Sequence, residues 1–84
     1  MGNINYENLV RELIKPLVTH PEEIVVTTES ADEKTINLKV LVHKEDIGRV
    51  IGKKGRVASS IRTLAYAAAM RQKQSINIEF EDHE

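Results

Sequence analysis

The residues best suited to chemistry are two glycines that enclose two lysines, Gly52-Lys53-Lys54-Gly55, between segments of helical periodicity. Gly52 can take the positive φ that ends a helix. Gly55 has no side chain, so a nucleic-acid backbone can pass close to it. The helix that begins there presents unpaired N–H groups and the positive end of its dipole to the loop. The pattern therefore predicts a clamp that holds a phosphodiester backbone without reading its sequence.

The charge distribution supports an anion-facing surface, although the formal net charge of -1 does not. Between Lys44 and Lys73, eight basic residues stand against two acidic ones, a net charge of +6. The rest of the chain has 4 basic and 11 acidic residues. A basic segment in an otherwise acidic chain indicates one localised surface for anions. On charge alone, an ordinary solvated helix face explains the segment equally well.

The loop must be positioned by two helices, which the apolar periodicity predicts at about residues 44–51 and 56–72. Strict alternation predicts strands over 24–29, 36–43 and 76–81. A further amphipathic helix is predicted at about residues 5–18, with Asn5 as N-cap and Pro16 weakening or kinking its last turn. The predicted core stripe of the longest helix consists of Val57, Ile61, Leu64, Ala65 and Ala68.

This order of elements predicts an α+β domain in two layers. One-sided strands need a single layer of helices, so we expect three helices on one face of a three-stranded mixed sheet. The first two strands should be antiparallel, and the helical crossover should make the second and third parallel. A chain of 84 residues suits one domain, and we expect a single domain over 1–84.

The segment VIGKKGRV, Val50 to Val57, followed by Ile61, resembles the signature of the KH domain. The element order resembles the bacterial type II arrangement, with a core motif at about 34–81. Three further segments, HPEE from His20, DIGRVIG from Asp46 and IRTL from Ile61, are similar to the small single-domain bacterial KH proteins of the KhpA type. The resemblance extends over essentially the whole chain.

This resemblance implies a groove for about four nucleotides of single-stranded RNA, with the Gly-x-x-Gly loop on the backbone. Single-stranded DNA stays an open alternative. The clamp residues would be Gly52, Lys53, Lys54 and Gly55. The groove wall and its flanks would comprise Ile47, Val50, Ile51, Arg56 and Arg62, with Leu41 as a weaker candidate for the floor. Core packing explains Val57 and Ile61, and Arg49 fits an RNA contact and a solvated surface residue equally well.

The resemblance also implies a post-transcriptional regulator or RNA chaperone, acting as a homodimer or with a larger KH-containing protein of the Jag/EloR kind. The alanine-rich helix independently indicates a second buried face, for which we predict a dimer interface of Ala58, Arg62, Tyr66, Ala69 and Met70. The competing explanation is that alanine is the best helix former and tolerates exposure. The alternative function is therefore a protein-interaction module with weak or no RNA binding.

Catalytic chemistry finds little support in the sequence. The chain has no cysteine, which excludes thiolate chemistry and cysteine-ligated metals. The histidines His20, His43 and His83 are isolated. The pair Ser59-Ser60 falls within a helix pattern and not at a nucleophile elbow. We therefore expect a protein that is not an enzyme and that has no metal site and no cofactor.

Other folds that bind nucleotides or RNA fit the sequence poorly as well. Three residues, not four, separate Gly48 from Gly52, and Lys54 stands where a phosphate-binding P-loop needs Ser or Thr. An RRM sheet needs stacking aromatics, and the chain has only three aromatic residues of the Phe, Trp and Tyr types.

No window approaches the roughly 20 apolar residues that span a bilayer, and the N-terminus lacks signal-peptide features. We therefore expect a cytoplasmic protein.

Overall fold

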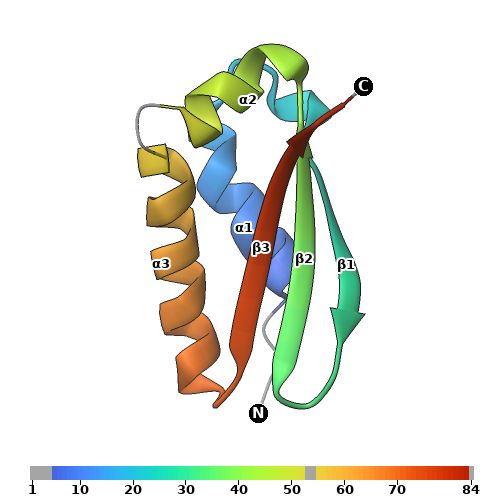
Figure 1. Ribbon diagram of the computed structural model, residues 1–84, viewed down its shortest axis with the longest axis vertical. Helices are drawn as coiled ribbons and strands as arrows, with labels where there is room; N and C mark the ends of the chain where they lie inside the picture. The colour runs from blue at the N-terminus through green and yellow to red at the C-terminus, as the bar shows by residue number, and fades with distance from the viewer. Residues whose placement is uncertain (1–4, 53–54, 84) are drawn as a thin grey trace.

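The computed structural model describes residues 5–52 and 55–83, which form a three-stranded sheet covered on one face by three α-helices (Figure 1). In chain order the elements are α1 (Tyr6–Ile14), η1 (Lys15–Leu17), η2 (Pro21–Glu23), β1 (Val25–Ala31), β2 (Thr35–Val42), α2 (Lys44–Ile51), α3 (Arg56–Arg71) and β3 (Ser75–Asp82), where η denotes a 3₁₀ turn. The predicted α+β class and the order helix, strand, strand, helix, helix, strand are confirmed.

The sheet has the order β1-β2-β3, so β2 is central and β3 is an edge strand. Strands β1 and β2 are antiparallel, and β2 and β3 are parallel, as predicted. Buried residues alternate strictly along β2, which turns one apolar face toward the helices. The β1–β2 turn is closed by the Asp32 carboxylate, which accepts bonds from the N–H groups of Lys34 (2.8 Å) and Thr35 (2.7 Å). These bonds lower the pKa of Asp32.

The first helix ends where its sequence weakens it. The Asn5 side chain accepts a 3.0 Å bond from the N–H of Asn8, which confirms the predicted N-cap. The α-helix stops at Ile14, and Pro16 lies in the 3₁₀ turn that follows. Proline has no N–H to donate to an α-helical turn, and in an α-helix its ring clashes with the carbonyl four residues earlier. The predicted weakening of the last helical turn is therefore confirmed.

The core lies between the sheet and the helices, but α3 is rotated relative to the predicted stripe. Ile61 and Ala65 are buried as predicted, whereas Leu64 is 54% exposed. Ala58 and Ala69 are buried instead, at 2% and 0% exposure. Small side chains let α3 approach its neighbours closely, and the larger Leu64 is left at the surface. The sequence-based assignment of Ala58 and Ala69 to an outward dimer interface is therefore wrong.

The helices of the described residues also bear on membrane insertion. None of them combines the length and the apolar character needed to cross a bilayer. The longest, α3, has 16 residues and carries three arginines.

Candidate nucleic-acid interface

The loop between α2 and α3 joins two helix ends through a tight turn. Helix α2 closes with the N–H of Gly52 donating to the carbonyl of Gly48 at 2.8 Å. The N–H of Gly55 then donates to the carbonyl of Gly52 at 2.9 Å. The two predicted clamp lysines, Lys53 and Lys54, lie outside the described residues.

The two glycines of the loop serve different purposes. Gly52 has a φ of −77°, so the positive φ predicted for it is wrong. A side chain there would collide with the carbonyl oxygen of Gly48, so Gly52 is required by lack of space. Gly55 has the positive φ, +65°, and directly precedes the first residue of α3. Glycine adopts this conformation without the strain that other residues incur, so Gly55 allows α3 to begin directly from the turn.

The predicted site residues on α2 are divided among three sides of the helix. Val50 is fully buried, so it supports the site from the core and offers no contact surface. At about 100° per residue, Ile47 and Ile51 share one flank, where Ile47 is half-buried and Ile51 is 51% exposed. Arg49 lies on the other flank. There it lines a hollow of about 360 Å³ with Leu17, Gly48 and Val57.

Arg62 connects α3 to the edge strand. Its Nε and Nη2 atoms donate to the carbonyl oxygen of Ile78 at 3.2 and 3.1 Å. The guanidinium also lies 5.1 Å from the centre of the Phe80 ring, a cation–π contact. Arg62 therefore covers a carbonyl on an edge strand that is otherwise open to pairing. Arg56, in contrast, is exposed at the start of α3, next to the loop.

Leu41 does not join the other predicted site residues. The side chains of β2 that face the helices are those of Ile36, Leu38, Val40 and Val42. Leu41 alternates to the opposite, open face of the sheet, where it pairs with Val25 and Glu81. It therefore cannot form the floor of a site bounded by α2 and α3.

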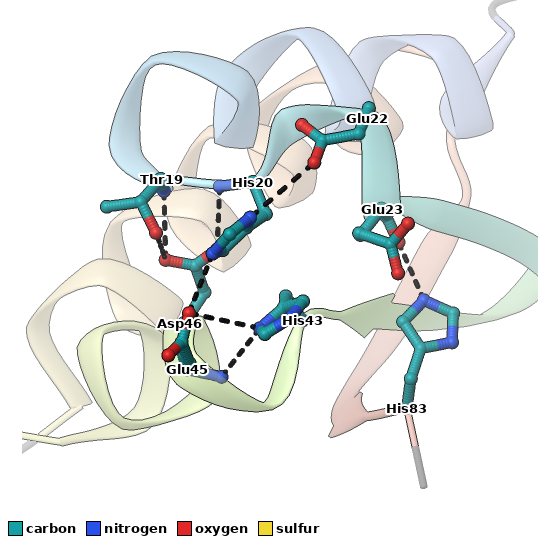
Figure 2. A network of polar contacts seen from close by, with 8 residues as sticks. All are labelled: Thr19, His20, Glu22, Glu23, His43, Glu45, Asp46 and His83. Atoms are coloured by element: carbon teal, nitrogen blue, oxygen red, sulfur yellow. Dashed lines mark hydrogen bonds and ion pairs between the residues drawn. The ribbon is translucent and has the colours of Figure 1, made fainter.

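The other end of α2 is held by a buried carboxylate, which Figure 2 shows. Asp46 is fully buried, and it accepts bonds from Thr19 N (2.9 Å), Thr19 Oγ1 (2.8 Å) and His20 N (2.9 Å). Burial raises the pKa of Asp46, but the bonds from Thr19 and His20 outweigh it and leave the pKa below its ordinary value. The carboxylate thus ties the first turn of α2 to the segment before β1.

Two of the three histidines meet in the same region, so their expected isolation is wrong. The rings of His20 and His43 stack with centroids 3.9 Å apart. His20 Nε2 lies 2.8 Å from Glu45 Oε1, and the N–H of Glu45 donates to His43 Nδ1 at 3.0 Å. The hydrogen bond to Glu45 is the main cause that raises the pKa of His20. No local sequence pattern announces a contact between residues so far apart in the chain.

The cluster has the ligand types of a metal site but not the geometry. His20, His43 and Glu45 each offer a ligand atom, all within 4.8 Å of one another. A bound Zn²⁺ lies about 2.0–2.1 Å from each ring nitrogen and close to the plane of each ring. The two stacked planes are inclined by only 23°, so they do not intersect at bonding distance from both rings. His43 Nδ1 is also already occupied by the N–H of Glu45.

Comparisons with known proteins agree with this architecture. The family model described as "KhpA/KhpB, KH domain" matches residues 7–80. The RNA-binding protein KhpA of Listeria monocytogenes is 48% identical over 73 residues, which cover 87% of this chain and 95% of that protein. The RNA-binding protein KhpA of Bacillus subtilis is 42% identical over 82 residues, which cover 98% of this chain and 100% of that protein.

Solved structures show the same fold at low sequence identity. Era in complex with MgGDPNP and nucleotides 1506–1542 of 16S ribosomal RNA matches with a TM-score of 0.70 and 19% identity. A variant of Aquifex aeolicus Era bound to GDP and AlF4⁻ matches with a TM-score of 0.69 and 19% identity. Each match covers 92% of this chain but only 29% of the Era chain. By its sequence relatives and its arrangement of helices and strands, the chain belongs to the KhpA/KhpB family of KH-domain proteins.

Proposed function

We propose that this protein binds single-stranded RNA and that the turn from Gly52 to Gly55 clamps the RNA backbone. The observation that carries the proposal is the geometry of the two glycines that bound this turn. Gly55, at a φ of +65°, directly precedes α3, whose first N–H groups have no acceptor within the helix. Gly52 leaves no room for a side chain beside the Gly48 carbonyl. The curated relatives from Listeria and Bacillus are named RNA-binding proteins, which supports the same ligand class.

The surroundings of the turn favour a polyanion with exposed bases. Arg49 and Arg56 are exposed on either side of the loop and supply positive charge. Ile51 offers an exposed apolar surface on the opposite flank of α2 from Arg49. The open face of the sheet differs, because Lys39 is paired there with Glu29 (2.9 Å) and Glu81 (3.6 Å). The positive charge beside the loop therefore lies on the helical side, where Arg49 is also 4.0 Å from the Asp46 carboxylate.

The proposal extends to assembly as a homodimer or with a second KH protein, in the role of a post-transcriptional regulator or RNA chaperone. Tyr66 is 41% exposed and Met70 is 73% exposed, one helical turn apart on α3. Together with the first residues of β3 they line a hollow of about 270 Å³. Arg62, engaged with β3, is less available to a partner than these two side chains. The same apolar surface favours the alternative function, a protein-interaction module.

Fluorescence anisotropy with pools of short labelled RNA distinguishes the two functions. The test variant is Lys53→Asp/Lys54→Asp. The control variant, Lys34→Asp/Lys73→Asp, makes the same change in net charge at the two turns farthest from the clamp (Figure 1). We expect the wild type and the control to bind, with affinity falling as salt rises, and the folded test variant not to bind. Equal binding by both variants, or none by the wild type, would contradict the clamp.

A further inference from the structure

The end of α2 opposite the clamp contains a group of ionisable side chains that the proposed clamp does not use. His20 comes from the segment before β1, and His43 lies between β2 and α2. Their stacked rings share one neighbour, Glu45, which bonds to His20 through its carboxylate and to His43 through its backbone N–H. Figure 2 shows both rings beside Asp46, with Glu22 on the outer side of His20.

The two histidines need different protonation states in this arrangement. His43 is the N-cap of α2, and its Nδ1 accepts the N–H of Glu45. An acceptor nitrogen carries no proton, so a proton there would remove the cap. His20 has two acidic neighbours, with Glu45 Oε1 2.8 Å from Nε2 and Glu22 Oε2 3.5 Å from Nδ1. Both nitrogens are donors only in the charged ring.

The remaining charged groups around the pair reinforce this difference. Asp46, from α2, is an anion that bonds to the backbone N–H of His20. Glu22 faces His20 from η2, and Glu45 faces both rings from α2. His83, from the end of β3, bonds to the carbonyl of Glu23 instead. Every ionisable group recorded in contact with His20, other than its stacking partner, is therefore acidic.

We propose that the stacked pair His20–His43 is a one-proton latch, which takes up a single proton on His20 and so fastens the start of α2 to the segment before β1. A second proton is opposed because two charged rings would face each other at a centroid distance of 3.9 Å. It would also displace the N-cap bond of α2. The latch is a property of folding stability, and it is independent of whether the loop binds RNA.

The sign of the effect follows from the shift at His20. Its pKa is raised from 6.5, first by the hydrogen bond to Glu45, so the folded state holds this proton more tightly than the unfolded state. The stabilisation is then complete below pH 6.5 and is lost as the pH rises through the higher folded-state value. We therefore expect the protein to be more stable at pH 6 than at pH 8.

A proton NMR titration of the three histidines in the wild type tests the latch directly, with EDTA present throughout. We expect His20 to titrate above pH 6.5 and the bond from the N–H of Glu45 to His43 Nδ1 to persist while His20 takes up its proton. Loss of this N-cap bond as His20 takes up its proton would overturn the proposal, as would a His20 titration at or below pH 6.5. If equimolar Zn²⁺ without EDTA shifted the signals of both His20 and His43 and raised the stability of the protein, the cluster would be a metal site and the latch would be wrong.

Denaturation at pH 6 and pH 8 provides the second test. The folding equilibrium constant of the wild type should fall between these values, by about tenfold for each unit by which folding raises the histidine pKa. His20→Gln should lose this dependence, whereas the control His83→Gln should keep it. The variant His43→Asn retains an N-cap oxygen without a second charge, and it should keep the His20 titration. A dependence that survives in His20→Gln would overturn the proposal.

Discussion

Asp46→Asn is the substitution whose consequence can be worked out most fully. The carboxylate is fully buried and accepts three hydrogen bonds, two at Oδ1 from Thr19 and one at Oδ2 from the N–H of His20. Asparagine has the same shape but only one acceptor oxygen. If that oxygen keeps the bonds to Thr19, the amide NH₂ group faces the N–H of His20, donor against donor. One charge-assisted bond is lost, and a buried donor is left without a partner. The ion pair with Arg49 (4.0 Å) is lost too, but it contributes little because Arg49 is exposed.

The magnitude follows from these losses. A hydrogen bond to a charged group contributes about 1.5–3 kcal/mol, and an unsatisfied buried group costs a similar amount. Because the site can relax in part, we expect Asp46→Asn to lower the free energy of unfolding by about 2–3 kcal/mol. For a domain of this size each kcal/mol corresponds to about 4–8 °C in the melting temperature. The expected decrease is therefore about 8–24 °C.

Urea denaturation followed by circular dichroism measures this loss, with Glu12→Gln as the control. Glu12 is exposed in an i,i+3 pair with Lys15, so its replacement should change stability by less than about 0.5 kcal/mol. Folding lowers the pKa of Asp46 from 3.8, so its contribution is complete above pH 3.8 and is lost as the pH falls through the lower folded-state value. A change of under about 0.5 kcal/mol in Asp46→Asn at pH 7 would refute this reasoning.

Three further predictions concern stability and use the same denaturation assay. Gly48 faces open space on α2, so Gly48→Ala should raise the free energy of unfolding by about 0.5–1 kcal/mol. Gly52→Ala should lower the free energy of unfolding, because its side chain would meet the Gly48 carbonyl. A change of the same sign in both variants would contradict the steric argument. Lys73→Gly should raise the free energy of unfolding by about 0.5–1 kcal/mol, since Lys73 has a φ of +58°. A lower free energy of unfolding would show that the contacts of the lysine side chain outweigh the backbone strain. Arg62→Met should cost about 1–2 kcal/mol through the bonds to Ile78, and an unchanged stability would mean that water replaces them.

The regular elements were predictable because their signals are local. Strand β2 buries every second residue without interruption, and alternation reveals such a strand directly. Helix α2 begins at Lys44 and ends at Ile51 as predicted, since an acidic first turn and a following glycine mark its ends. Strand β1 runs to Ala31, beyond the predicted boundary at residue 29, because pairing with β2 carries it through polar residues.

The sequence-based errors concern residues whose type is compatible with more than one environment or backbone conformation. Alanine suits a helix core and a helix surface equally, so composition could not decide between Ala58 and Leu64 for the buried side of α3. Both loop glycines permit a positive φ, and only the path of the chain assigns it to Gly55 and a steric role to Gly52. The cluster around Asp46 joins residues 26 or more positions apart, which a periodicity within one element cannot reveal.

The bonds of Asp46 limit how this module can be cut or transplanted. Its donors come from Thr19 and His20, ahead of the strand–helix–helix–strand core that begins with β2. A fragment that starts at β2 would contain the buried carboxylate without any of these donors and with only the Arg49 guanidinium, 4.0 Å away, beside it, and burying a charge whose hydrogen bonds are missing is costly. A graft of the clamp onto another scaffold must therefore carry the segment around Thr19 or replace Asp46 with an apolar residue. In this protein the segment around Thr19 and His20 therefore belongs to the same folding unit as the two helices that bound the clamp.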